Sequence, residues 1–224
     1  MKDKNCHAEL VSASLRRFRN KFGMTIILAL LISLFISCTT EVSLTLQKDD
    51  SVDIRFEGGA GEAFTRMISS AAGLGDGALI DTDSVSYELA KAGFSGVKVN
   101  QKNGTAVNIS MTDKKQSSYL FTSKIVKAEK GKLKAAISRK SLEDFYAASD
   151  EQTRMILDLF LAPVFNNEEM SEAEYLEMLA AFYGKPAAQE VSESLVKINL
   201  ISKDGSKEKV VIPLSQLLCG YDIL

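Results

Sequence analysis

The sequence is poor in the residues on which much enzyme chemistry depends. Its 224 residues include no tryptophan, one histidine, three cysteines and three prolines. The only histidine is His7, so a chain without its first residues could form no histidine-dependent catalytic triad and no histidine zinc site. With 46% hydrophobic and 25% charged residues, the composition is otherwise typical of a folded globular protein.

The N-terminal segment carries a basic stretch followed by an uncharged apolar run. Its basic residues are Arg16, Arg17, Arg19 and Lys21, and the apolar run spans residues 24–36. This run is short for a bilayer span, which needs about 20 residues, but it fits the hydrophobic region of an export signal. We therefore expect residues 1–37 to be a signal peptide, with an uncleaved N-terminal membrane anchor as the alternative.

The end of the apolar run carries a resemblance to a known family. Phe35-Ile36-Ser37-Cys38 is similar to the lipobox of bacterial lipoproteins, although Phe35 stands where that pattern usually has leucine. The resemblance implies that Cys38 is acylated and becomes the first residue after cleavage. A lipid anchor such as palmitate would then hold the protein to a membrane of the cell envelope. In some bacterial lipoproteins, an aspartate after the acylated cysteine is a signal for retention in the inner membrane. Thr39 stands at this position, so the resemblance slightly favours the outer membrane.

Loss of the signal peptide would make the chain more acidic. Six of the 27 basic and two of the 29 acidic residues precede Cys38, which leaves 21 basic against 27 acidic side chains, a formal charge of −6. This balance disfavours nucleic acid as a partner and leaves membrane attachment to the lipid. With Cys38 acylated, Cys219 has no partner for an intramolecular disulfide, and we expect it to be a buried apolar side chain.

Alternating apolar residues and turn signals predict strands paired as hairpins. The expected pairs join 41–47 with 51–57, 97–101 with 105–112, 118–129 with 132–138, and 195–201 with 208–212. Turn sequences such as Asn103-Gly104 lie between the paired segments.

Helical spacing and capping residues predict helices between the strands. The expected helices are about 62–72, 84–92 with Asp83 as its cap, three further helices that begin at Ser141, Ser149 and Ser171, and a short one begun by Pro213.

Together these elements predict an α+β fold, in which an antiparallel sheet of six to eight strands is built from hairpins and has helices packed on one face. Residues 38–224 suit a single lipid-anchored domain. The alternative is a separate helical subdomain covering residues 140–186.

The most apolar part after Cys38 is the segment 155–165, which core packing would explain. Its nearly continuous apolar character also suits a surface that contacts an envelope protein or a lipid. The residues that we assign to this partner surface are Met155, Leu159, Phe160, Phe165, Tyr175 and Phe182.

No motif in the sequence identifies a catalytic, cofactor or metal site. Asp81 and Asp83 have the spacing of calcium ligands, but the rest of such a loop is missing. We therefore expect a binding or envelope-structural module that is not an enzyme and uses no cofactor. The alternative is a carboxylate-dependent hydrolase acting on envelope polysaccharide, which would need two carboxylates about 5–10 Å apart.

Overall fold

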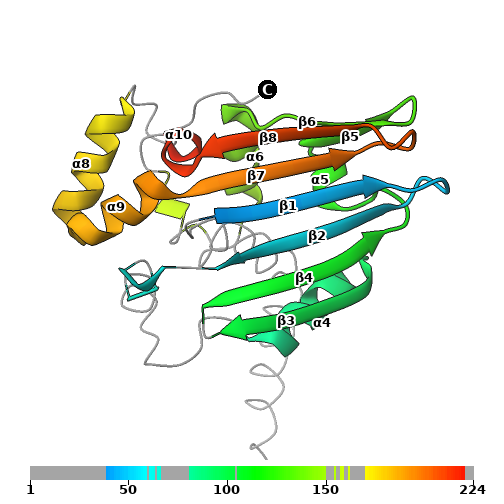
Figure 1. The fold of residues 1–224 in the computed structure, drawn as a ribbon, viewed down its shortest axis with the longest axis horizontal. Coiled ribbons are helices and arrows are strands. Elements are labelled where there is room, and N and C mark those ends of the chain that lie inside the picture. The colour runs from blue at the N-terminus through cyan, green and yellow to red at the C-terminus, as the bar shows by residue number, and fades with distance from the viewer. Residues whose placement is uncertain are drawn as a thin grey trace, which may run out of the picture.

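A six-stranded sheet with the strand order β3-β4-β2-β1-β7-β8 organises the fold (Figure 1). The computed structural model describes residues 39–59, 61–63, 65–66, 81–103, 105–149, 154, 157–158, 161 and 170–219. The strands are β1 (Thr39–Leu46), β2 (Val52–Gly59), β3 (Ser95–Asn103), β4 (Ala106–Asp113), β7 (Leu195–Ile201) and β8 (Lys207–Pro213).

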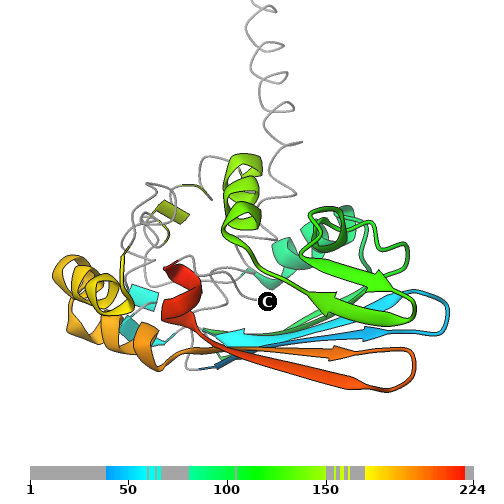
Figure 2. The same ribbon diagram turned by 90° about the horizontal axis from the view of Figure 1, so that it is seen from above.

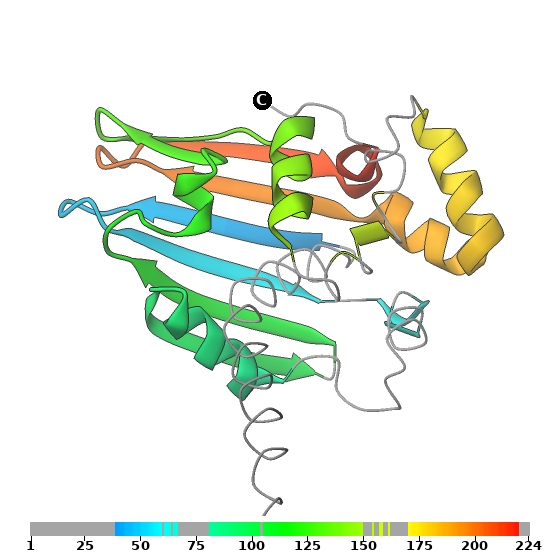
Figure 3. The ribbon, with the colours of Figure 1, turned by 180° about the vertical axis from the view of Figure 1, so that it is seen from behind.

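The described helices cover one face of this sheet and leave the other face bare (Figures 2 and 3). The small β5–β6 hairpin, of Val126–Glu129 and Lys132–Ala135, lies on the covered side. The helices are α4 (Thr82–Lys91), α5 (Tyr119–Thr122), α6 (Arg139–Ala148), α8 (Glu172–Tyr183), α9 (Lys185–Glu193) and α10 (Leu214–Leu218). The predicted α+β fold, with a mostly antiparallel sheet and helices on one face, is confirmed.

The sheet contains one parallel pair. Its other neighbours are antiparallel, and the predicted hairpins β1–β2, β3–β4 and β7–β8 all form. β1 instead runs parallel to β7, with Thr39 opposite Leu195 and Thr45 opposite Ile201. The N-terminal strand therefore occupies the middle of the sheet, between β2 and β7. The sheet expected to be antiparallel is therefore mostly so, with one parallel pair that the sequence did not predict.

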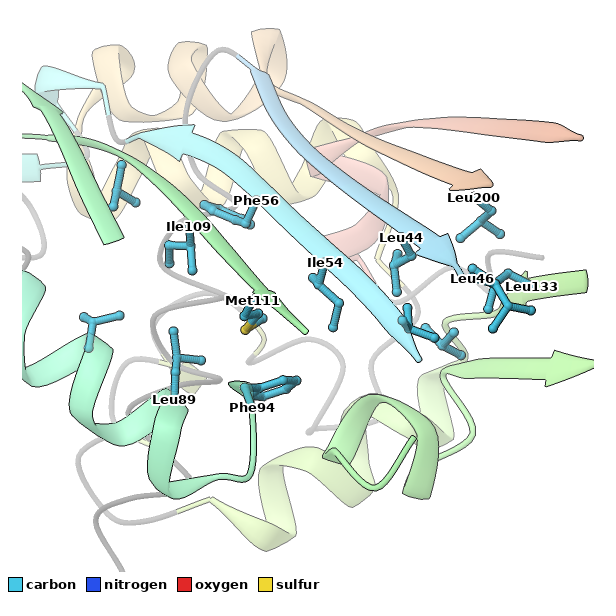
Figure 4. Close-up of a cluster of buried hydrophobic side chains, with 14 residues drawn as sticks. Leu44, Leu46, Ile54, Phe56, Leu89, Phe94, Ile109, Met111, Leu133 and Leu200 are labelled. Atoms are coloured by element: carbon cyan, nitrogen blue, oxygen red, sulfur yellow. The ribbon is translucent and has the colours of Figure 1, made fainter. Parts of the chain in front are cut away.

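Alternation along the strands builds the core on the covered face. Leu44, Ile54, Phe56 and Ile109 are at most 5% exposed, and they meet Leu89 of α4 in the cluster shown in Figure 4. Removing a large side chain from such a core costs about 2–5 kcal/mol.

A second core cluster fills the same face of the sheet beneath the C-terminal helices. It joins Val196 of β7 and Ile212 of β8 to Tyr175 and Leu179 of α8. Ile198 of β7 packs against both clusters, so the C-terminal helices share one sheet with the rest of the described fold.

Two local predictions are wrong, and one helix was not predicted. Ser118–Thr122 does not begin a strand, because Ser118 precedes α5 and β5 starts only at Val126. The helix expected from Ser141 begins after Ser138, whose side chain accepts a hydrogen bond from the Ser141 N–H in a capping box. The helix α9 was not expected as a separate element.

The acidic residues before α4 also differ from the prediction. Asp81, and not Asp83, is the N-cap, since its carboxylate accepts hydrogen bonds of 3.1 Å from the backbone N–H groups of Asp83 and Ser84. Asp83 lies in the first turn, where a negative charge interacts favourably with the helix dipole. Asp81 therefore has a structural role at the start of this helix.

Candidate functional site

Most of the predicted site lies outside the described residues. This holds for the predicted lipidation residue Cys38 and for four members of the predicted partner surface, Met155, Leu159, Phe160 and Phe165. The structure does place the residue after Cys38 and the two remaining members of that surface, Tyr175 and Phe182. The candidate site is therefore built from the start of β1 and from α8.

The start of β1 is held firmly in the sheet. Thr39 lies opposite Leu195 of β7, and Thr40 lies opposite Val196. The Thr40 side chain is completely buried. The first described residue, Thr39, is thus already part of the sheet, and no residue separates it from position 38.

Local sequence determines where α8 begins and ends. Ser171 and Glu174 form the predicted capping box: the Ser171 hydroxyl accepts from the Glu174 N–H at 3.3 Å, and the Glu174 carboxylate accepts from the Ser171 N–H at 2.9 Å. Hydrogen bonds from Ser171 lower the pKa of Glu174 below its ordinary value. At the other end, Gly184 has φ +88°, a conformation that glycine adopts without strain.

The chain turns at Gly184 directly into α9, so α8 and α9 form a corner. Pro186 lies in the first turn of α9, where its missing N–H costs no helical hydrogen bond. This corner lies at the end of the molecule where β1 begins, beyond the ends of the strands (Figures 1 and 2).

The two placed members of the predicted partner surface have opposite environments. Tyr175 is completely buried in the core beneath α8, so its assignment to a surface is wrong. The reason is that it begins the inner stripe of the helix, continued by Leu179 one turn later. Phe182, in the last turn, is 76% exposed. Of these two residues, Phe182 is therefore the one that a partner can reach.

Cys219, at the C-terminal end of α10, is a free and buried thiol, as the sequence predicts. Burial, assisted by the nearby Glu172 carboxylate, raises the pKa of this thiol to about 11. The thiol stays protonated at neutral pH, and a protonated thiol is a poor nucleophile. Cys219 therefore has the character of a core side chain.

Two carboxylates face each other on the bare side of the sheet. Glu41 of β1 lies directly opposite Glu57 of β2. Glu57 forms an ion pair with Lys102, and Glu41 accepts a hydrogen bond of 2.8 Å from Asn199. These interactions offset the repulsion expected between like charges on neighbouring strands, which favours a structural over a catalytic role for the pair.

Sequence reasoning missed one buried carboxylate. Asp113, at the end of β4, is 2% exposed and accepts hydrogen bonds of 2.9–3.1 Å from the backbone N–H groups of Lys115, Ser117 and Ser118. Burial raises the pKa of Asp113, but interactions with Ser118 and with the other N–H donors outweigh that effect and lower the pKa overall. The signal available in the sequence was an aspartate at a strand end before a polar turn.

The described part of the chain contains no cluster of side chains suited to hold a metal ion. None of the helices in the described ranges is long and apolar enough to cross a membrane. Comparison with protein-family models, with curated proteins and with solved structures finds no match to this chain.

Proposed function

We propose that this protein is a lipid-anchored module of the bacterial cell envelope. In this proposal the signal peptide ends at Ser37, Cys38 carries the acyl chains, and the α+β domain acts by binding or as a structural component. Two or more acyl chains suffice for stable attachment, because each buried CH₂ contributes about 0.8 kcal/mol to membrane affinity.

One observation carries this proposal. β1 begins at Thr39, the residue after the cysteine of the lipobox-like sequence Phe35–Cys38. Cleavage before Cys38 would remove residues 1–37 and leave every described strand and helix intact. The expected processing point thus lies directly before the first described strand.

Mass spectrometry of the native protein tests the anchor directly. The N-terminal peptide should begin at Cys38 and carry a diacylglycerol group. A Cys38→Ser variant should leave the membrane fraction or remain as the unprocessed precursor. A Cys219→Ser variant is the matched control and should be processed and membrane-bound like the parent. Recovery of unmodified Cys38 in a chain that still carries residues 1–37 would overturn the proposal.

A further inference from the structure

The position of β1 limits how the domain can sit on a bilayer. Consecutive Cα atoms are 3.8 Å apart, so the Cα atom of residue 38 lies within about 4 Å of that of Thr39. Thr39 is hydrogen-bonded into the sheet beside β7, and Thr40 is buried. Acyl chains on Cys38 would therefore hold this end of the sheet against the bilayer. This constraint rests on the lipid anchor proposed above.

The two ends of the sheet differ in chemistry. The far end, where β1 finishes, carries polar turns at residues 48–50, 114–117 and 202–206. At these turns Lys203 pairs with Asp50, and Asp204 accepts hydrogen bonds from Ser206. The end where β1 begins carries instead the corner between α8 and α9 (Figure 1).

Along α8, towards its corner with α9, the side chains change from acidic to apolar. The acidic residues Glu172, Glu174 and Glu177 all lie in its first half. Its last turn, residues 180–183, carries no charge and ends beside the basic Lys185 of α9. Phe182 extends from this turn with 76% of its surface exposed. An aromatic ring next to a lysine is typical of segments that lie in the bilayer interface.

We propose that Phe182 inserts into the bilayer interface and gives the anchored domain a second point of contact. The occupant of this surface is the membrane to which Cys38 is attached. Moving one phenylalanine side chain out of water contributes too little free energy to bind a free protein to a membrane. It is enough to orient a protein already tethered there, because the second contact is intramolecular.

The absence of tryptophan makes a direct test practical. A Phe182→Trp variant places a single tryptophan at the α8–α9 corner. A Tyr87→Trp variant is the matched control, because Tyr87 on α4 is 66% exposed but lies away from this corner. Each full-length acylated variant is reconstituted into phosphatidylcholine–phosphatidylglycerol vesicles, with and without bromine on the acyl chains, and the vesicles are recovered by flotation.

Tryptophan at position 182 should lose a large part of its emission in the brominated vesicles, while tryptophan at position 87 should not. Equal emission of the Phe182→Trp variant in both vesicles, with the protein floating, would overturn the bilayer contact and leave the anchor standing. Acrylamide quenches the fluorescence of exposed tryptophan. If the tryptophan at position 182 were protected from acrylamide in native membranes but not in the vesicles, the surface would bind a protein partner, against this proposal. A protein that does not float would overturn the anchor as well as the contact.

Discussion

The Glu190 carboxylate accepts a hydrogen bond of 2.9 Å from the backbone N–H of Ala63, 127 positions earlier in the chain. Glu190 lies on α9, whereas Ala63 lies in the helical residues that follow β2. The carboxylate thus satisfies an N–H group at a helix start, and it joins the C-terminal helices to the segment that follows the N-terminal hairpin. A Cβ atom at Gly61 would lie 2.5 Å from this carboxylate, so the contact also favours glycine there.

Replacing Glu190 by alanine should lower the free energy of unfolding by about 1–2 kcal/mol, because the Ala63 N–H loses its acceptor. Urea denaturation followed by circular dichroism measures the change. Glu193→Ala on the same helix is the control: Glu193 is exposed and accepts a hydrogen bond of 2.8 Å from Gln189, so its loss should change stability by less than about 0.5 kcal/mol. Equal losses in the two variants would contradict a specific role for Glu190.

Asp113 should make stability depend on pH in the acid range. Its pKa is lower in the folded state than the ordinary aspartate value of about 3.9. The unfolded chain therefore takes up the proton first, and the stabilisation present at neutral pH is lost as the pH falls through the folded-state pKa. In Asp113→Asn, loss of the charged acceptor should cost about 1–3 kcal/mol at pH 7.

The Asp113→Asn variant should also lose less stability than the parent protein between pH 5 and acid pH. The urea midpoint of each protein, measured at about five pH values from pH 6 to pH 2, gives the pH dependence of its stability. Asp204→Asn compares the buried Asp113 with an exposed aspartate. Asp204 lies in an exposed turn, and hydrogen bonds from Ser206 lower its pKa. If the stability of Asp113→Asn and that of the parent changed equally with pH, the buried carboxylate would make no contribution to the pH dependence of stability.

Gly59 should not tolerate a side chain. At the end of β2, a Cβ atom on Gly59 would lie 2.6 Å from Ala106 Cβ and 2.8 Å from the Thr105 carbonyl oxygen. Gly59→Ala should therefore push β2 and β4 apart and destabilise the fold by about 1–3 kcal/mol. The Gly59→Ala/Ala106→Gly double variant should recover only part of this loss, since the backbone contacts remain. Full recovery would attribute the whole effect to the Ala106 methyl group.

Cys219 should resist alkylation in the folded protein. Its thiol is buried, and its pKa of about 11 leaves almost no thiolate at pH 7. Iodoacetamide should modify position 219 only after urea unfolds the chain, as intact-protein and peptide mass spectrometry can measure. Rapid modification of the folded protein in the absence of urea would show that α10 opens readily.

Sequence patterns within short segments predicted many of the strands and helices. The hairpins β1–β2, β3–β4 and β7–β8 follow from alternation around short turns, and α8 follows from the Ser171–Glu174 capping box. The parallel pairing of β1 with β7 was not predictable in this way, because no local turn connects these strands. The same limit applies to Glu190 and Ala63, whose contact depends on the tertiary arrangement.

The sequence did not show which face of α8 is buried, and this limited the prediction of the site. The sequence predicted the helix α8, but two of its aromatic residues, Tyr175 and Phe182, were assigned to one surface. The two positions are seven residues apart, close to two helical turns, yet one is buried and the other exposed. The core beneath α8 distinguishes them: Tyr175 packs there with side chains of β7, β8 and α10, elements that follow later in the chain.

The central place of β1 has a consequence for the order of assembly. When the chain emerges in sequence order, the hairpin β1–β2 can form first, and β4 can join β2 soon afterwards. The other edge of β1 has no neighbour until β7 has also emerged, about 150 residues later. For that interval the nascent chain presents an open strand to its surroundings, where other chains could pair with it. Protection of this edge, by a chaperone or by rapid completion of the chain, would therefore decide how much of the protein reaches its native form.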